Sequence, residues 1–367
     1  MLIAQESVKL KITFTLPGPG KHPIGGFKVV YQYANCLAAN GHSVAVVHTA
    51  LLDKTTAILE YPKKLARFFQ RAIDKSYLPN KWFSIDPRVQ LLWRPSLSER
   101  FIHESDAIIA TAWQTAEWVS DYPSSKGEKF YLIQHWENWG HNDISRLEQT
   151  WRAPLHKIVI ARWLKDIADS MGEESDYIPN GLDFDSFGID HDIKLRNPYH
   201  IMMLYHPLSW KGSRYGVEAL ISLKKEFPCL VGTLFGTTRR PTLPPWIEYY
   251  RLPSPLLLRE LYNRAAIFLA PSLSEGWGLP ACEAMMCGTA VVATDIGGHR
   301  EFLEHGHNGL FVPPADSLGL AAAVRTLIAD QKLRSDLARA GYESIKKFTW
   351  RRACDSFELV LRKYTNA

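Results

Sequence analysis

The sequence predicts two α/β domains, each built on a doubly wound and mostly parallel sheet. The chain has 367 residues, which is long for a single core and favours two domains. Strand-like and helix-like segments alternate through the first half, and the same alternation restarts near residue 201. Alternation of this kind is typical of parallel sheets, because consecutive parallel strands need a crossover connection.

The first segments predict a βαβ unit. Lys9–Leu16 alternates like a strand, Gly18–Gly26 is glycine-rich, and residues 27–40 have helical periodicity. Gly41 suits the end of that helix, and a second strand follows. The remaining strands expected in this half are Ser43–Thr49, Val89–Trp93, Ala107–Thr111, Lys129–His135, Ile158–Ala161 and Tyr177–Ile178, with helices at Thr115–Asp121, Ile144–Arg152 and Arg162–Met171.

The second series follows a polar, aperiodic stretch at Asp183–Pro198. Its expected strands are Ile201–Tyr205, Leu230–Phe235, Ala266–Leu269, Ala290–Ala293 and Leu310–Val312, with helices at Ser213–Phe227, Ala281–Cys287 and Leu318–Ala329. Open α/β sheets bind ligands at the carboxyl ends of their strands. We therefore expect the two domains to face each other across a cleft that holds the chemistry.

Composition restricts the class of protein without naming a reaction. The formal charge of +5 is mild, and nucleic-acid binding would usually need more. The five cysteines are scattered and have no metal-ligand spacing, which predicts reduced thiols rather than a disulfide framework: Cys36, Cys229, Cys282, Cys287 and Cys354. Met1–Lys11 carries charges where a signal peptide needs an apolar core, and no stretch reaches the length of a membrane span. A cytoplasmic protein is expected.

The strongest local pattern is Pro271–Ala284, which runs from a strand through a glycine loop into a helix. Gly276 and Gly278 allow the backbone to approach a ligand, and Pro280 suits the first helical turn. Backbone amides and the positive end of the helix dipole would then face a diphosphate. Glu275 and Glu283 can accept hydrogen bonds from sugar hydroxyls. Alternatively, Glu283 only complements the helix dipole and Glu275 only caps a turn.

With seven residues between its two glutamates, this segment resembles the corresponding motif of glycosyltransferase family 4, which comprises retaining enzymes of the GT-B fold. Phe268–Pro271 and Gly288–Gly298 also resemble that family. The resemblance implies that Glu283 binds the nucleotide ribose and that Glu275 binds the transferred sugar. It also implies that the loop residues bind the donor near its phosphates: Gly276, Trp277, Gly278 and Leu279.

A second family feature is an Arg and Lys pair that neutralises the leaving diphosphate, and this chain has His206 and Lys211 in those places. A fixed cation near the leaving group lowers the barrier in the transition state. Lys211 can supply that charge. Without the family resemblance, Lys211 would be interpreted as a solvated lysine. His206 is a conditional cation, unless bound phosphate keeps it protonated or Arg214 or Arg264 substitutes. The segment Ile178–Asp183 resembles the family's hinge between domains.

The first half supplies three further candidates. Gly25 and Gly26 open a helix and match the paired-glycine loop of the family, which implies contact with the donor phosphates. His135 ends a strand beside the aromatic residues Trp136 and Trp139, and by resemblance it contacts the donor sugar, although a structural histidine remains an alternative. Trp113 is a weaker candidate on the acceptor side.

The segment from 54 to 100 has little periodicity and an excess of basic residues interleaved with aromatic ones. Such a segment could dock on anionic lipid or receive a lipid-linked acceptor, but a solvated basic face over core aromatics is an equal alternative. We expect at most peripheral contact with the inner face of the membrane.

The resemblance implies domains at 1–180 for the acceptor and 181–345 for the donor, with a closing helix at 346–367 that returns to the first domain. It implies a metal-independent hexosyl- or deoxyhexosyltransferase of the bacterial surface-polysaccharide type, without cofactor, that moves a sugar from a nucleotide-diphosphate sugar to a glycan or lipid-linked acceptor. Two alternatives remain open: a sugar phosphorylase or epimerase on this fold, and a non-catalytic binding partner.

Overall fold

The computed structural model describes residues 8–21, 23–54, 61–138 and 144–365. The chain divides into two units, Met1–Gly181 with Trp350–Ala367, and Leu182–Thr349. The first boundary falls inside the segment Ile178–Asp183, which the sequence resemblance presents as a hinge. Trp139, named above beside His135, and His22, within the glycine-rich segment, lie outside the described residues.

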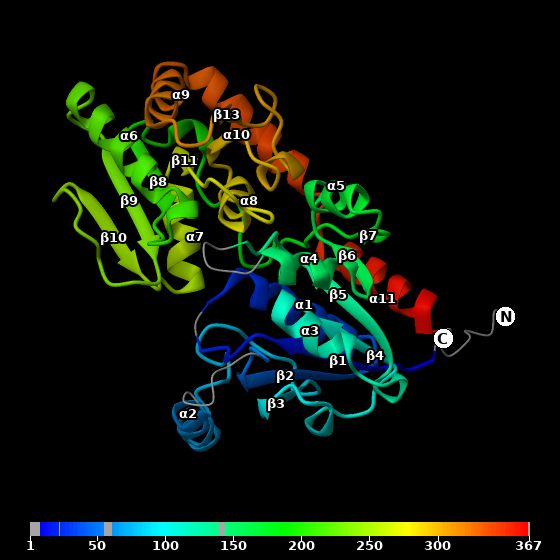
Figure 1. Ribbon diagram of the computed structural model, residues 1–367. Coiled ribbons are helices and arrows are strands. Elements are labelled where there is room, and N and C mark those ends of the chain that lie inside the picture. The colour runs from blue at the N-terminus through cyan, green and yellow to red at the C-terminus, as the bar shows by residue number, and fades with distance from the viewer. Residues whose placement is uncertain (1–7, 22, 55–60, 139–143, 366–367) are drawn as a thin grey trace. The chain divides into compact units, whose positions relative to one another are not determined.

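The first unit is built on a parallel sheet with the strand order β3-β2-β1-β4-β5-β6-β7 (Figure 1). Its described strands are β1 (Lys11–Leu16), β2 (Ser43–Leu51), β3 (Gln90–Ser96), β4 (Ala107–Ala110), β5 (Glu128–Ile133), β6 (His156–Val159) and β7 (Ser175–Tyr177). Its described helices are α1 (Gly25–Ala39), α2 (Tyr61–Asp74), α3 (Trp113–Ser120), α4 (Ile144–Arg152), α5 (Arg162–Ser170) and α11 (Trp350–Thr365).

The second unit has the strand order β10-β9-β8-β11-β12-β13, again with every described pairing parallel. Its described strands are β8 (His200–Leu204), β9 (Val231–Gly236), β10 (Ile247–Arg251), β11 (Ile267–Ala270), β12 (Ala290–Thr294) and β13 (Leu310–Val312). Its described helices are α6 (Ser213–Glu226), α7 (Pro255–Arg264), α8 (Leu279–Met286), α9 (Ser317–Ala329) and α10 (Gln331–Ile345). The prediction of two doubly wound parallel sheets is confirmed.

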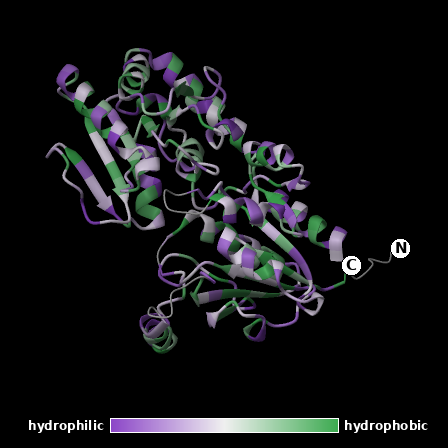
Figure 2. Cartoon of the chain, in the orientation of Figure 1, coloured by the Kyte–Doolittle hydropathy of each residue, from purple (hydrophilic) through white to green (hydrophobic). Residues whose placement is uncertain are grey.

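The central strands are buried on both faces, which is why they read as continuous apolar runs (Figure 2). In β11 every residue is buried, and β12 is buried along its whole length. In each sheet the strand order reverses between two central strands, β1 with β4 in the first unit and β8 with β11 in the second. Loops after those strands diverge to opposite faces and leave room for a ligand.

α11 packs inside the first unit, although it is the last helix of the chain. Its Phe357 stacks on Phe14 of β1 and on Tyr33 of α1, with ring centroids 6.0 and 4.4 Å apart. Asn40, which follows α1, donates a hydrogen bond to Glu358 at 2.7 Å. Apolar packing and this polar contact together hold the C-terminal helix on the amino-terminal sheet.

This packing corrects the expectation that every cysteine is a reduced thiol. Cys36 of α1 and Cys354 of α11 form a disulfide, with Cα atoms 6.5 Å apart. Such a separation is within the range that a disulfide spans. The sequence could not reveal the pair, because 318 residues separate the two cysteines and only the return of α11 brings them together. The three other cysteines, Cys229, Cys282 and Cys287, are free thiols.

Three elements of the structure were not expected from the sequence, namely α2, α7 and β10. The segment 54–100, which was read as having little periodicity, contains the helix α2. That interpretation was wrong, because Tyr61, Leu65, Phe69 and Ile73 recur every four residues, which is a helical spacing, although their side chains are exposed. The edge strand β10 was also missed, since only its first residue, Ile247, is fully buried.

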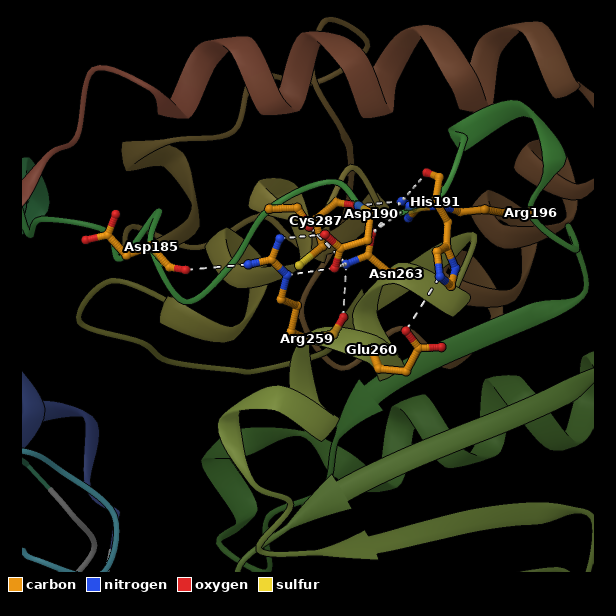
Figure 3. A network of polar contacts seen from close by, with 9 residues as sticks. Asp185, Asp190, His191, Arg196, Arg259, Glu260, Asn263 and Cys287 are labelled. Carbon is orange, nitrogen blue, oxygen red and sulfur yellow. Dashed lines mark hydrogen bonds and ion pairs between the residues drawn. The ribbon is translucent and has the colours of Figure 1, made fainter.

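The polar stretch that precedes β8 is fixed to the second unit by a network of polar contacts (Figure 3). Asn263 lies at its centre: its side-chain oxygen accepts from the Asp190 amide at 2.7 Å, and its amide nitrogen donates to the Gly188 carbonyl at 2.9 Å. Arg259 forms a two-pronged ion pair with Asp190. Polar residues without apparent periodicity therefore have defined positions here.

Arg196 is the most buried cation of this network, with 6% of its surface exposed. Its guanidinium donates to the carbonyls of His191, Ala265, Cys287 and Gly288, and to the side-chain oxygens of Asn263 and Thr289. Cys287 and Gly288 follow α8 and Ala265 follows α7, so Arg196 binds carbonyls left without partners at two helix ends. Burial lowers the pKa of Arg196 to about 10, which leaves it charged at neutral pH.

Candidate active site

The candidate site of the second unit lies at the reversal point of its sheet. β8 pairs with β9 on one side and β11 on the other, so the loops after Leu204 and Ala270 leave from adjacent strand ends. The first loop carries His206 and Lys211, and the second carries Glu275 and the following glycines. Residues more than sixty positions apart are thereby brought to one edge of one sheet.

Lys211 and Glu275 form a two-pronged ion pair in this place. The Lys211 ammonium lies 2.9 Å from Oε1 and 2.8 Å from Oε2 of Glu275. The Ser272 hydroxyl donates to Oε1 of the same carboxylate at 2.8 Å. The lysine side chain is 24% exposed and the glutamate 13%, so both charges remain accessible to a small ligand.

The surroundings of Glu275 keep its carboxyl group ionised. Burial by itself would raise the pKa of Glu275, but the charge and hydrogen bond of Lys211 lower it, with smaller contributions from His299 and Ser272, and the net pKa is below the ordinary value. An ionised carboxylate can only accept hydrogen bonds. Glu275 is therefore set up as an acceptor for hydroxyl groups, beside a fixed cation.

Backbone contacts fix the two loops to each other. The Trp210 carbonyl accepts hydrogen bonds from the amides of Leu273 and Ser274, at 2.7 and 3.3 Å. Gly212, with φ of +61°, lies so close to the second loop that a Cβ atom would be 1.8 Å from the Pro271 carbonyl oxygen. A side chain at position 212 would therefore separate the loops and move Lys211 away from Glu275.

A third loop, which follows β12, packs against the backbone of Glu275. Its residues were not assigned to the site from the sequence. Gly298 approaches the Glu275 backbone so closely that a Cβ atom would lie 2.5 Å from its carbonyl oxygen. The next residue, His299, is buried, and its Nδ1–H donates to the Thr294 carbonyl at 2.8 Å. Burial lowers the pKa of His299, which keeps it neutral at pH 7. The glycine pair Gly297 and Gly298 was the sequence signal that could have indicated this loop. A single histidine after the pair was not distinctive.

His206, which occupies the place of the family's arginine, is uncharged at neutral pH in the free protein. Its Nδ1 accepts a hydrogen bond from the Leu208 amide at 3.2 Å, which leaves Nε2 to carry the proton of the neutral ring. Burial lowers its pKa, the neighbouring Lys211 lowers it further, and Glu275 only partly opposes these effects. His206 can therefore donate one hydrogen bond, but Lys211 supplies the positive charge.

Neither arginine named as a substitute takes the place of that missing cation. Arg214 is turned to its neighbour Tyr215, with which it forms a hydrogen bond and a cation–π contact. Arg264 ends α7, and its carbonyl accepts a hydrogen bond from His200 at the amino end of β8. The amino end of a strand lies at the edge of the sheet opposite to Lys211.

The glycine loop leads into α8 through Gly278, whose left-handed φ of +109° precedes the first helical residue, Leu279. The Trp277 ring is buried against Phe302 and Phe348, so only its backbone is suited to contact a ligand. Farther along the helix, Glu283 accepts a hydrogen bond from the buried Tyr262 hydroxyl at 3.0 Å. This contact orients the glutamate in the first turns of α8.

The remaining candidates belong to the first unit and are described within it. Gly25 and Gly26 are the first residues of α1, and the Gly26 carbonyl accepts from the Gln134 side chain at 3.2 Å. His135 follows Gln134, donates from Nδ1 to the Trp136 carbonyl at 2.8 Å, and packs edge-on against Trp163. The start of α1 and the end of β5 therefore meet in this unit.

Trp113 is buried at the start of α3, and its amide donates to Glu137 at 2.9 Å. Burial raises the pKa of Glu137 to about 7, although the Trp113 hydrogen bond opposes that shift. The role of Trp113 in the described structure is to position Glu137, rather than to present its ring to solvent.

The glycine-rich loop after β1 is anchored by a buried histidine of β2. Nδ1–H of His48 donates to the Gly18 carbonyl at 2.8 Å, and Nε2 accepts from the Tyr31 hydroxyl at 3.1 Å. Burial lowers the pKa of His48 from 6.5 to about 4, although the Gly18 hydrogen bond opposes the shift. Both ring nitrogens are used, so protonation of the ring would break the Tyr31 contact.

This histidine predicts a loss of stability in acid. In the unfolded chain His48 binds a proton below its ordinary pKa of 6.5, whereas in the folded chain it binds one only below about pH 4. Its contribution to stability is thus complete above pH 6.5 and falls as the pH decreases, and about 2 kcal/mol of it is lost at pH 5. Thermal unfolding at pH 7.5 and 5.0 should show a smaller difference for His48→Gln than for wild type. His307→Gln, at an exposed position, is the control and should keep the wild-type difference.

Among the described residues, no group of three or more His, Cys, Asp or Glu side chains is arranged to hold a metal ion. The same residues contain no helix with the length and apolarity needed to cross a membrane.

Residues 253–344 match the family model of glycosyl transferases group 1. The matched segment includes Glu275, the glycine loop and Glu283, while Lys211 lies before it. The D-inositol 3-phosphate glycosyltransferase of Geodermatophilus obscurus is 40% identical over 111 residues, which are 30% of this chain and 23% of that protein. The alpha-maltose-1-phosphate synthase of Mycolicibacterium smegmatis is 36% identical over 113 residues, 29% of each protein. The chain thus matches less than a third of the length of these curated relatives.

The fold resemblance covers nearly the whole chain. HepE of Anabaena, solved in complex with UDP and glucose, superposes with a TM-score of 0.73 at 17% identity, over 96% of this chain and 100% of that one. Together with the two parallel sheets described above, this likeness shows that the chain has the GT-B fold.

Proposed function

We propose that this protein is a retaining glycosyltransferase that transfers a sugar from a nucleoside-diphosphate sugar to a hydroxyl group. The observation that carries the proposal is the Lys211–Glu275 pair beside the glycine loop at the start of α8. A cation, an ionised acceptor and a helix amino terminus are the three groups needed to bind a diphosphate next to a sugar. The family match over residues 253–344 supports the same activity.

In the proposed reaction, the bond between the anomeric carbon and the diphosphate oxygen breaks as the acceptor oxygen binds that carbon on the same face. The acceptor proton passes to the leaving diphosphate. Lys211 stabilises the negative charge that develops on the leaving group, and loop amides add to this effect. Glu275 orients the transferred sugar and Glu283 the ribose. We propose no metal or cofactor, because Lys211 and the helix dipole supply positive charge.

We further propose that the protein belongs to glycosyltransferase family 4 and acts in the assembly of a bacterial surface polysaccharide. The transferred group would be a hexose or deoxyhexose, and the acceptor a glycan or lipid-linked precursor. The first unit would hold the acceptor, while His135 would contact the donor sugar and Gly25 and Gly26 the donor phosphates, in a protein located in the cytoplasm. These details rest on the sequence resemblance.

The donor site is tested by measuring thermal unfolding with a panel of nucleotide sugars, in the presence of a chelator. One donor at a hundred times its dissociation constant should stabilise the protein by about 3 kcal/mol, a shift of about 5–10 °C. Glu283→Ala removes a charged acceptor and should weaken that donor about 10- to 100-fold, whereas Glu283→Gln keeps the contact with Tyr262. Glu343→Ala, on an exposed surface of α10, is the control.

The stabilising donor is then incubated with candidate acceptors. Transfer without added metal supports the proposal, and activity that appears only with manganese contradicts its metal-independent form. Dependence on inorganic phosphate would indicate a phosphorylase, and product without acceptor an epimerase. Donor binding without turnover of any acceptor would indicate a binding partner. Absence of a shift with every donor would contradict the proposed site.

A further inference from the structure

α2 presents an apolar stripe to solvent. Tyr61, Leu65, Phe69 and Ile73 are 44%, 51%, 56% and 82% exposed. They are spaced four residues apart, so they lie along one side of the helix. No residue of α2 is buried, which is unusual for a helix with this many large apolar side chains.

The other side of α2 is basic. Lys63 and Arg67 are exposed, and Lys64 and Arg71 are half-buried. At about 100° per residue these four side chains occupy one continuous arc on the side of the helix opposite the apolar stripe. The only acidic residue of α2 is Asp74, its last residue. Figure 2 shows the resulting mixture of hydrophobic and hydrophilic residues on this helix.

Residues outside the stripe fix α2 to the sheet. The Phe68 ring stacks on Trp93 of β3, with centroids 6.0 Å apart and planes at 16°, and the Trp93 indole donates to the Phe68 carbonyl at 3.0 Å. The Arg71 guanidinium lies 5.7 Å from the centre of the Trp93 ring. The orientation of the helix is thus set by Phe68 and Arg71, and that orientation leaves the other apolar residues outward.

We propose that α2 is a docking surface for an anionic lipid bilayer. An amphipathic helix with bulky apolar residues on one side and cations on the other lies in the membrane interface, with its apolar side in the acyl region and its cations at anionic headgroups. The helix is about 21 Å long, its cations Lys63 and Arg67 are exposed, and its only acid is the terminal Asp74, so its charge complements such a surface. This inference uses residues outside the candidate active site and does not depend on the proposed reaction.

The test is flotation of the full-length protein with vesicles of phosphatidylcholine alone or mixed equally with phosphatidylglycerol. The protein should bind the anionic vesicles and not the neutral ones, and binding should weaken as salt is raised because added ions screen the headgroups. Binding to neither vesicle, or equal binding to both, would overturn the proposal.

Two variants separate the apolar and electrostatic contributions. Leu65→Ser with Phe69→Ser and Ile73→Ser removes most of the stripe, and Lys63→Glu with Arg67→Glu reverses two charges. Each should lower partition into anionic vesicles at least about tenfold, since each removes several apolar groups or cations from the interface. All five positions are exposed, so thermal unfolding should stay near that of wild type.

The matched controls lie in the second unit. Leu256→Ser with Leu318→Ser alters two leucines that are 80% and 75% exposed, and Lys332→Glu reverses a charge whose side chain is 88% exposed. Both should bind vesicles as wild type does, and an equal loss in controls and α2 variants would refute a specific surface. If light scattering shows that the wild-type protein is a dimer and the triple serine variant is not, the stripe serves self-association instead. Donor-induced thermal shifts should be unchanged in the α2 variants. The result of the vesicle test is therefore separate from the test of the active site.

Discussion

Replacing Lys211 by methionine is expected to reduce kcat for sugar transfer by about 10²- to 10³-fold, the cost of removing one group that stabilises charge in a transition state. Methionine keeps most of the volume and removes the charge that lies 2.8 and 2.9 Å from the Glu275 carboxylate. The effect should fall mainly on kcat, with a smaller loss of donor affinity, because the charge of the leaving group grows during the reaction. Steady-state kinetics measures the loss of kcat, and donor titration measures the loss of donor affinity.

The same substitution should change the pH dependence of the reaction. In wild type the pKa of Glu275 is below its ordinary value. Protonation of the carboxylate that orients the sugar should therefore reduce activity only at a pH below the ordinary pKa of a glutamate. Without Lys211, burial raises the pKa of Glu275, and the acid limb of the pH profile should move toward neutral pH. Lys211→Arg should keep the profile close to wild type, since it retains the charge. Lys332→Met, which removes an exposed lysine paired with Asp336, should change neither kcat nor the profile.

A Lys211→Met protein with wild-type kcat would contradict the assignment of this residue. A fall in activity without a shift of the acid limb would indicate that Lys211 acts on the diphosphate and not on Glu275.

Replacing Arg196 by methionine is expected to destabilise the second unit by about 3–5 kcal/mol. The substitution leaves the carbonyls of four residues, as well as Asn263 and Thr289, without the donor that binds them. Buried polar atoms that lose their partners cost the full free energy of their desolvation. For a domain of this size the unfolding temperature should fall by about 10 °C.

Arg325→Met provides the matched control, because Arg325 is 45% exposed and pairs with Glu226 at the surface. It should cost less than about 1 kcal/mol, as surface ion pairs do. Urea unfolding monitored by the tryptophans of both units measures the free energy of unfolding, and a loss below about 1 kcal/mol for Arg196→Met would show that water replaces the arginine. Donor binding measured below the unfolding transition should persist, because Arg196 is not part of the candidate site.

The alternation of apolar and helical segments was enough to predict both sheets, because buried parallel strands leave continuous apolar runs such as β11 and β12. The glycine loop before α8 was likewise visible, since glycines and a proline at fixed spacing are local signals. Elements without a continuous buried apolar run gave a weaker signal, even though the apolar residues of α2 recur every four positions. β10 and α2 were therefore missed, and α2 is the element on which the inferred lipid surface rests.

The sequence by itself determined the two doubly wound domains and the residue types available for binding a diphosphate, because periodicity and turn chemistry act over a few residues. Only the tertiary structure decided which of those residues meet. The reversal of strand order between β8 and β11 brings Lys211 to Glu275, burial makes His206 and His299 neutral, and the return of α11 joins Cys354 to Cys36. These outcomes depend on burial and on distances between segments far apart in the chain, which no local pattern encodes.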